Sequence, residues 1–160
     1  MRRIFTIFGS VIALTALTTT VALGAVTFHS GPDFDFNSDG SVTVTGDMSG
    51  LGNQPATATI VQSVTAFYTC QNPGGNIAPG QKGVSFTSDP VSQALSTDKN
   101  GRAVLDLTAP AIAPDATVGG KTAGCPNGRW IGINPVISEQ SATLTITQRG
   151  QVIYTETVFA

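Results

Sequence analysis

Apolar residues that alternate with threonine or serine are the feature that most limits what this chain can fold into. In Ser41-Val42-Thr43-Val44-Thr45, for example, the valines occupy every second position. A period of two is that of a half-buried β-strand, and threonine suits the solvent-facing side because its β-branched side chain fits a pleated strand. Beyond residue 25 the chain has no long pattern with the 3.6-residue period of a helix. We expect strands at 41–45, 59–70, 84–87, 103–108, 142–147 and 152–159.

Turn residues separate these stretches. Asp98-Lys99-Asn100-Gly101 and Gln148-Arg149-Gly150-Gln151 each join two of them, and their glycines supply the positive φ of a tight hairpin. Segments 71–81 and 109–127 are rich in proline, which cannot donate to a sheet ladder, so we expect loops at the ends of the sheets there. This arrangement predicts an all-β fold, an immunoglobulin-like antiparallel two-sheet sandwich of about seven to nine strands.

The first 25 of the 160 residues have the order of a secretory signal peptide. A short basic start, Met1-Arg2-Arg3, precedes the uncharged apolar stretch Ile4–Leu23, and small residues close the segment. We expect cleavage after Gly24 or Ala25, which leaves residues 26–160 as a single secreted β-sandwich domain with no stable membrane span. The alternative is that the apolar stretch is retained as a membrane anchor, since about 20 apolar residues can cross a bilayer.

The chain has two cysteines, Cys70 and Cys125. In an oxidising compartment, an even pair without metal-ligand spacing predicts one structural disulfide. A zinc site would need two more ligands, and the single histidine, His29, falls in what we expect to be an N-terminal tail. The alternative is a redox-active pair, but the C-x-x-C spacing and an adjacent base are lacking. The sequence therefore predicts a Cys70–Cys125 bond that stabilises the fold, and it indicates no cofactor.

The segment Asp35-Phe36-Asn37-Ser38-Asp39-Gly40 matches the first half of a calcium-binding loop, in which alternating oxygen side chains contact the ion. The twelfth position of such a loop would be Gly46, so the closing bidentate carboxylate is missing. Two interpretations stay open: a weak calcium site formed by Asp35, Asn37 and Asp39, or a hairpin turn between flanking apolar residues. We favour the turn and assign no metal site.

If the two cysteines bond, the loops that follow them lie side by side at one end of the sandwich. These loops are Cys70-Gln71-Asn72-Pro73-Gly74-Gly75-Asn76 and Cys125-Pro126-Asn127-Gly128-Arg129-Trp130. A planar aromatic side chain beside amide groups and a guanidinium group could bind a sugar, a carboxylate or a peptide terminus. The candidate ligand-binding residues are Asn72, Asn76, Asn127, Arg129 and Trp130. The alternative is that Trp130 packs on the disulfide as core, while the Asn and Gly residues only form turns.

Residues suited to catalysis are scarce. A serine or cysteine hydrolase needs a base, usually histidine, and His29 lies outside the predicted strands. Glycoside hydrolysis needs two carboxylates across a cleft, but the only glutamates are Glu139 and Glu156, and Glu156 falls on an otherwise apolar strand face. No phosphate-binding loop or dinucleotide-binding glycine pattern is present. We therefore expect that the protein is not an enzyme.

The charge balance argues against a nucleic-acid partner. The chain has 8 Lys and Arg residues against 10 Asp and Glu residues. Removal of Arg2 and Arg3 with the signal segment leaves 6 basic against 10 acidic residues, and no block of like charges occurs. A basic groove or a basic membrane-binding face is therefore not expected.

Two resemblances follow from these segments. The run Ser38–Gly46, the Cys70–Asn76 loop and Cys125-Pro126-Asn127 resemble a set of small secreted bacterial β-sandwich proteins with a C-x-N-P-G-G-N loop, whose function is uncharacterised. That resemblance covers most of the chain and implies no activity. The turns around Asp39 and Asp98, together with Arg129-Trp130, are similar to neocarzinostatin-type apoproteins, which are secreted immunoglobulin-like sandwiches that carry an enediyne chromophore. No chromophore-binding residue is carried over.

The sequence thus predicts an extracellular, non-catalytic structural or binding protein that acts on a ligand or protein outside the cell. One alternative is a small-molecule or carbohydrate carrier that uses the loop rim around Cys70 and Cys125. A further alternative is a subunit of an extracellular surface assembly, because an exposed edge strand at Val152–Phe159 could pair between molecules. The sequence does not specify the ligand, the partner or the oligomeric state.

Overall fold

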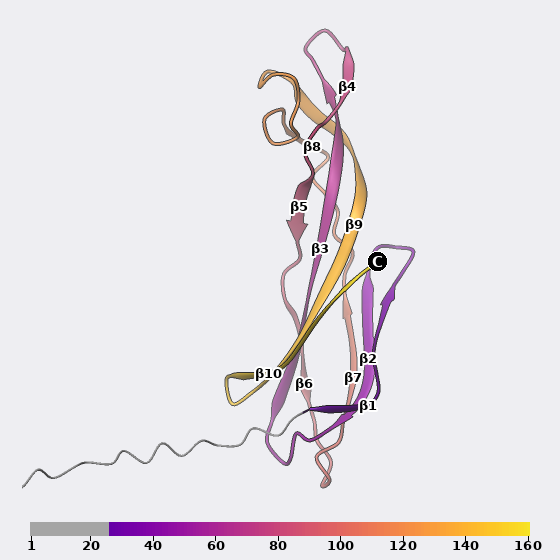
Figure 1. Cartoon of the computed structure of the whole chain (residues 1–160), viewed down its shortest axis with the longest axis vertical. Coiled ribbons are helices and arrows are strands. Elements are labelled where there is room, and N and C mark those ends of the chain that lie inside the picture. The colour runs from indigo at the N-terminus through magenta and orange to yellow at the C-terminus, as the bar shows by residue number, and fades with distance from the viewer. Residues whose placement is uncertain (1–25) are drawn as a thin grey trace, which may run out of the picture.

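The computed structural model describes residues 26–160, which form ten β-strands and no helix (Figure 1). The predicted signal peptide and its cleavage site lie outside these described residues. No segment in the described part is a helix that could span a membrane. The strands are β1 (Thr27–Phe36), β2 (Val42–Ser49), β3 (Ala56–Gln71), β4 (Ile77–Pro79), β5 (Val84–Thr87), β6 (Val91–Leu95), β7 (Ala103–Ala109), β8 (Thr117–Gly119), β9 (Ile131–Gln148) and β10 (Gln151–Phe159).

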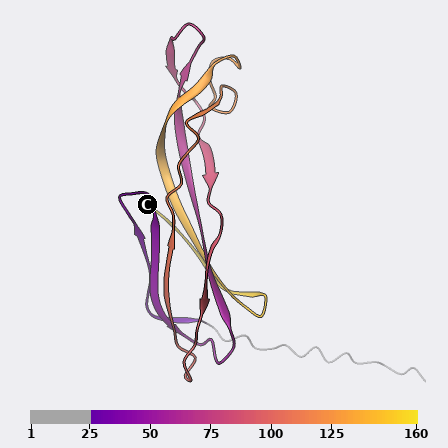
Figure 2. The same cartoon turned by 180° about the vertical axis from the view of Figure 1, so that it is seen from behind.

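The strands form two antiparallel sheets, as the alternation predicts. One sheet has the order β1-β2-β7, and the other is built on β10-β9-β3. The long strands β3 and β9 run the length of the molecule, while the three-stranded sheet covers only one end of them (Figures 1 and 2). The strand count exceeds the predicted one because β4, β5 and β6 are short segments laid end to end along one edge of β3. Prolines and glycines between them interrupt what would otherwise be one long strand.

The main core lies between the two sheets and follows the predicted alternation. In β7, every second side chain is buried, and the facing side chains of β2, β3 and β9 are buried in the same way. Threonines occupy most of the intervening, solvent-facing positions, so the hydrophobic face of each strand is covered by its partner sheet. The buried residues of this core are Val42, Val44, Met48, Leu51, Ala56, Ala58, Ile60, Leu95, Ala103, Leu105, Leu107, Ala109, Ala142, Leu144 and Ile146.

A second, smaller core lies at the other end of β3 and β9. Its buried members are Ala66, Tyr68, Cys70 and Ala123. Partly buried residues from β5, β8 and the loop before β9 pack against it. We call this region the disulfide end: the 72–76 turn, β4, the 119–131 loop, β8, and the adjoining ends of β3 and β9.

Segments 71–81 and 109–127 are not loops throughout, because β4 (Ile77–Pro79) and β8 (Thr117–Gly119) lie within them as short edge strands. Two further expectations about local structure are wrong. His29 does not lie in a tail, because β1 pairs with β2 from Thr27 opposite Ser49 onward. The polar residues around Gly31 and Pro32 and two register shifts in β1 conceal this strand in the sequence. The Asp98–Gly101 turn is tight, but it joins β6 to β7, which belong to different sheets and are not a paired hairpin.

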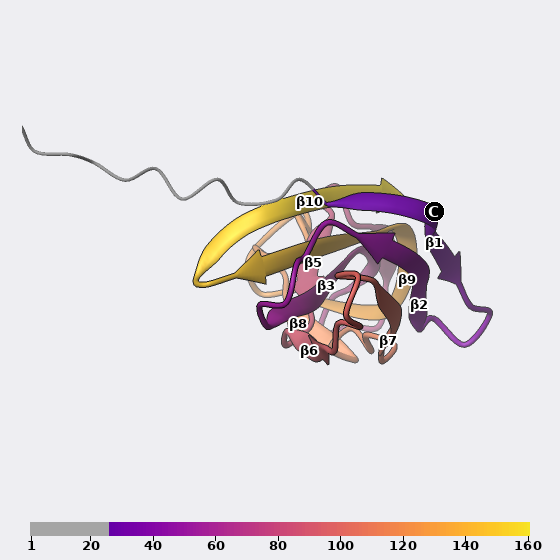
Figure 3. The same ribbon diagram turned by 90° about the horizontal axis from the view of Figure 1, so that it is seen from below.

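The Gln148–Gln151 turn does form a hairpin, between β9 and β10. Arg149 and Gly150 both have positive φ, at 53° and 75°, as a two-residue hairpin loop requires. On this side of the sandwich, β10 lies next to β1 (Figure 3), and the rings of Phe28 and Tyr154 contact each other with centroids 5.0 Å apart. On the opposite side, β6 and β7 are the facing edges of the two sheets.

Candidate functional site

Cys70 and Cys125 are bonded, which confirms the predicted disulfide. Their Cα atoms are 5.6 Å apart, and the bond joins residues separated by 55 positions in the chain. Cys70 is completely buried within β3, whereas Cys125 is partly exposed in the 119–131 loop. The bond therefore attaches this loop to a central strand of the larger sheet.

Strand pairing brings the two predicted loops to the same end of the sandwich. Gln71, the last residue of β3, lies opposite Ile77 of β4 on one side and Ile131 of β9 on the other. The 72–76 turn therefore emerges beside the point where the 119–131 loop enters β9. Figure 1 shows β4 and β8 at this same end of the molecule, where β4 pairs with β3 and β8 pairs with β9. The juxtaposition that the cysteine pairing predicts is present.

Two of the candidate ligand-binding asparagines use their side chains to shape turns. Asn72 Oδ1 accepts hydrogen bonds from the backbone N–H groups of Gly74 and Asn76, each at 2.9 Å. Asn127 Oδ1 accepts one from the backbone N–H of Arg129 at 3.0 Å. These are the side-chain-to-backbone bonds typical of turn asparagines, so the turn interpretation accounts for both residues.

Trp130 is partly buried against the smaller core, alongside Cys125. Its backbone N–H donates to the carbonyl of Asn127, and the loop folds tightly over Gly120. A Cβ atom at Gly120 would lie 2.3 Å from the Trp130 carbonyl oxygen, so only glycine fits there. The packing matches the alternative in which Trp130 covers the disulfide, and the exposed members of the candidate set are Asn76, Asn127 and Arg129.

Exposed apolar side chains form a strip on the outer face of the larger sheet at the disulfide end. Phe67 of β3 lies opposite Val136 of β9, and Ile77 and Ile131 flank Gln71 on the same face. Their exposed fractions are 42% for Phe67, 67% for Val136, 69% for Ile77 and 46% for Ile131. We call these four residues the apolar strip. No local sequence pattern predicts the strip, because its members come from three strands and their positions relative to one another depend on register.

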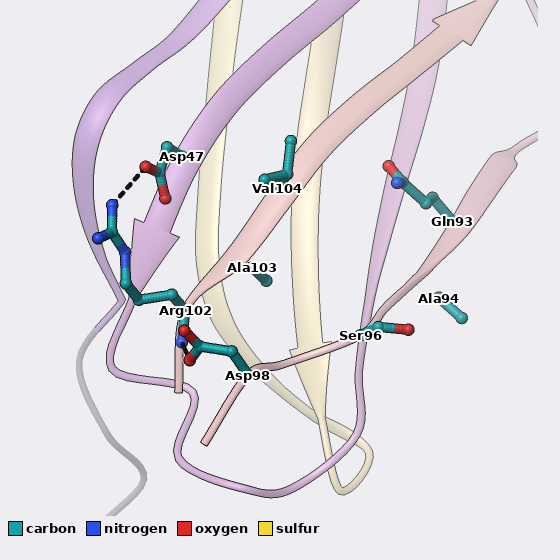
Figure 4. A pocket seen from close by; sticks show the side chains of 8 residues that line it. All are labelled: Asp47, Gln93, Ala94, Ser96, Asp98, Arg102, Ala103 and Val104. Carbon is teal, nitrogen blue, oxygen red and sulfur yellow. Dashed lines mark hydrogen bonds and ion pairs between the residues drawn. The ribbon is translucent and has the colours of Figure 1, made fainter. Parts of the chain in front are cut away.

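A second feature, which the sequence analysis also missed, is an open groove of about 520 Å³ between β6 and β7 (Figure 4). Its charged groups are already paired. Arg102 Nη2 lies 2.6 Å from Asp47 Oδ2, and Asp98 Oδ1 accepts from the backbone N–H groups of Asn100 and Arg102. The Arg102 N–H bond is the main reason that the pKa of Asp98 is below its ordinary value. Asp47 and Arg102 are 55 residues apart, so no local pattern could reveal their contact.

The segment 35–40 forms a hairpin turn between β1 and β2. Asp39 Oδ1 accepts hydrogen bonds from the N–H and the hydroxyl of Ser41, at 2.9 and 2.7 Å, and these bonds lower the pKa of Asp39. The Asn37 side-chain amide donates to the hydroxyls of Ser41 and Thr43. Within residues 26–160, no three His, Cys, Asp or Glu side chains are placed to share a metal ion. The hairpin interpretation accounts for all of these contacts.

The structure also places His29 beside a hydroxyl. His29 Nε2 lies 2.8 Å from Ser49 Oγ, across the β1–β2 pair. A nucleophilic serine needs such a base, but also a group that orients the imidazole and donors for the oxyanion. The contact lies on the exposed outer part of the sheet, and within the described residues the histidine ring makes no hydrogen bond to a carboxylate. Within the described residues, the pair therefore lacks the orienting carboxylate of a catalytic triad.

Comparison with known proteins gives little further information. No protein-family model matches the chain, and no curated protein matches it. Among solved structures, the crystal structure of Spo0M, a sporulation control protein from Bacillus subtilis, is similar to it with a TM-score of 0.32 and 12% sequence identity. The alignment covers 88% of this chain and 48% of that one, so the chain spans about half the length of that protein. A likeness of this size carries no argument about function, and none of the comparisons bears on the resemblances noted from the sequence.

Proposed function

We propose that this is an exported, non-catalytic binding protein that holds an extracellular protein partner with its disulfide end. The observation that carries the proposal is the apolar strip. Phe67, Ile77, Ile131 and Val136 expose apolar surface together, although the alternating pattern elsewhere puts threonine on the outer face. Exposed apolar side chains gathered on one face of a stable scaffold are typical of interaction sites.

The surroundings of the strip suggest the chemistry of the partner. Lys82, Lys121 and Arg129 are all exposed within or beside the loops of the disulfide end, and the 119–131 loop packs on the face of β3 opposite the strip. These basic groups would attract acidic residues of a partner that extends beyond the strip. A partner surface with an apolar patch and acidic residues at its margin would complement this end.

A protein partner is favoured over a carried small molecule. A hollow at the disulfide end, lined by residues of 82–85 and by Thr122, has a volume of about 250 Å³. Small-molecule sites usually enclose roughly 300–1,000 Å³ and bury most of the ligand. The disulfide supports export, because such bonds persist mainly in oxidising compartments, and so does the signal-like composition of the first 25 residues.

The proposal is tested by cross-linking on the cells that secrete the protein. The variant Ile77→Ser/Ile131→Ser removes two members of the strip, and Val104→Ser is the matched control because Val104 is also 68% exposed but lies on β7 of the other sheet. We expect the wild type and the control to form the same cross-linked adduct and the strip variant to lose it. An adduct that survives in the strip variant would refute the proposed site, and recovery of the protein only inside the cells would refute export.

A further inference from the structure

The outer edge of β10 is a long edge of the larger sheet whose only irregularity is one register shift, between Val152 and Tyr154. It is nine residues long and contains no Pro, Gly, Lys or Arg. Natural proteins usually protect an edge of this length with proline, charge, bulges or a covering segment, because its unpaired backbone groups can add another strand. The one charged side chain of β10, Glu156, is half-buried on the inner face and accepts a hydrogen bond from the Tyr154 hydroxyl.

Most other edges show these protections, although the seven-residue edge strand β7 also contains no Pro, Gly, Lys or Arg. β1 contains Pro32 and two register shifts. β4, β5 and β8 have only three or four residues each. β6 has only five residues and follows Pro90, and its Gln93 side chain accepts a hydrogen bond from the backbone N–H of Asp106 in β7.

The register identifies which backbone groups of β10 are free. The N–H of Ala160 donates to the carbonyl of Gln140, which makes those two residues a hydrogen-bonded antiparallel pair. Such pairs alternate with non-hydrogen-bonded pairs, and the β9–β10 register runs unbroken from Tyr154 to Phe159. The even-numbered residues therefore direct their backbone groups to β9. Thr155, Thr157 and Phe159 direct theirs outward, and all three side chains are exposed.

We propose that β10 is a self-association edge, where a second copy of this chain pairs antiparallel about a two-fold axis at Thr157. In this register Thr157 lies opposite its own copy and Thr155 lies opposite Phe159 of the second chain. All three outward residues then form hydrogen-bonded pairs, with about six backbone hydrogen bonds in total. The Phe159 ring, 73% exposed in the single chain, covers Thr155 of the other copy.

Charge and the bulge disfavour the neighbouring registers. A two-fold axis at Glu156 would place two carboxylates directly opposite each other, which destabilises a strand pair. An axis at Thr155 would require Ile153, where the β9–β10 register shifts. With the axis at Thr157, Glu156 lies opposite Val158 of the second chain instead.

The pairing closes at two copies. A two-fold pair uses the same edge of both copies, so it leaves no β10 edge free for a third chain. A pair of this length buries less than the roughly 1,600 Å² of a standard stable interface, so we expect a dissociation constant in the micromolar-to-millimolar range. The dimer leaves the disulfide end of each copy free, since the edge lies along the end that carries the main core (Figure 1).

Sedimentation equilibrium of the full chain, recovered as the secreting cells deliver it, tests the proposal. We expect the average mass to rise from one chain to two with concentration and to stop there. Thr157→Lys places two cations at the axis and should abolish the rise. Thr45→Lys, an exposed threonine on β2 of the other sheet, is the control and should dimerise like the wild type. A wild type that stays monomeric at millimolar concentration, growth beyond two chains, or an unaffected Thr157→Lys variant would each overturn the proposal.

Amide hydrogen exchange of the wild type gives a second test that needs no variant. The N–H groups of Thr155, Thr157 and Phe159 should exchange more slowly at high concentration than at low. Those of Tyr154, Glu156 and Val158 should be protected at both concentrations, because they bond to β9. Equal concentration dependence for the two sets, or none for either, would overturn the assigned edge.

Discussion

Removal of the disulfide by Cys70→Ala/Cys125→Ala should destabilise the protein by an amount that follows from the length of the closed loop. The bond joins residues 55 positions apart. On the chain-entropy model, a loop of this length corresponds to about 4 kcal/mol of stabilisation, which is a roughly thousandfold change in the ratio of unfolded to folded protein. Typical domains have a net stability of only about 5–15 kcal/mol, so the variant should be close to the limit of folding.

The loss should be concentrated at the disulfide end. The smaller core has four buried residues, whereas the main core has fifteen. Without the bond, the 119–131 loop is held by a few backbone hydrogen bonds, such as those from Lys82 to Ala123 and from Cys125 to Gly120. This end should therefore open locally at a lower free energy than the main core unfolds.

Urea denaturation followed by circular dichroism measures the global change, and amide exchange locates it. We expect a clearly lower urea midpoint for the variant. The amide exchange rates of Gly80, Lys82 and residue 125 should increase far more than those of residues in β2 and β7. Reductant should lower the wild-type midpoint and leave the variant unchanged, which controls for the substitutions themselves. Equal midpoints for oxidised and disulfide-free protein would refute the reasoning, and so would acceleration spread evenly over both ends.

Three further outcomes test other parts of the fold. Gln148→Leu should lower the free energy of unfolding in urea by roughly 1–3 kcal/mol, because the carbonyls of Leu51 and Gln54 lose their buried donor. Gln62→Leu should cost less, because the Gly40 carbonyl that Gln62 contacts also accepts a hydrogen bond from Gln140. A larger loss for Gln62→Leu than for Gln148→Leu would contradict these contacts. Burial, together with the hydrogen bond to Glu156 and its charge, raises the pKa of Tyr154 from 10.0 to about 12, so the free energy of unfolding should fall as pH rises through this interval. Glu156→Gln should lower the pH midpoint of the tyrosinate absorbance. An unchanged midpoint in that variant would contradict the assigned causes. Hydrogen bonds lower the pKa of Asp39 and Asp98 below 3.8, so their contribution to stability should be fully present above pH 3.8 and be lost as pH falls through the folded pKa values. The variant Asp39→Asn/Asp98→Asn should therefore show a smaller decrease of melting temperature at acid pH than the wild type.

Part of the candidate site could be predicted and part could not. Two cysteines without metal spacing are sufficient to predict one bond, and the bond predicts that the loops around Asn72 and Asn127 lie at one end. The side-chain roles within those loops were beyond local inference. An asparagine in a Pro-Gly-rich loop fits both a turn and a ligand contact, and only the backbone donors around Asn72 decide in favour of the turn.

The sequence by itself determined the all-β class, the inward face of strands such as β7, the β9–β10 hairpin and the disulfide. These depend on period, on turn residues with positive φ and on a count of thiols, all of which are local or compositional properties. Tertiary structure alone decided which strands share a sheet, that β6 and β7 separate into different sheets, and that Phe67 and Val136 become neighbours on an exposed face. The physical reason is that pairing partners and register are set by long-range contacts and by how the two sheets cover each other, whereas a strand's own residues specify only which of its faces is apolar.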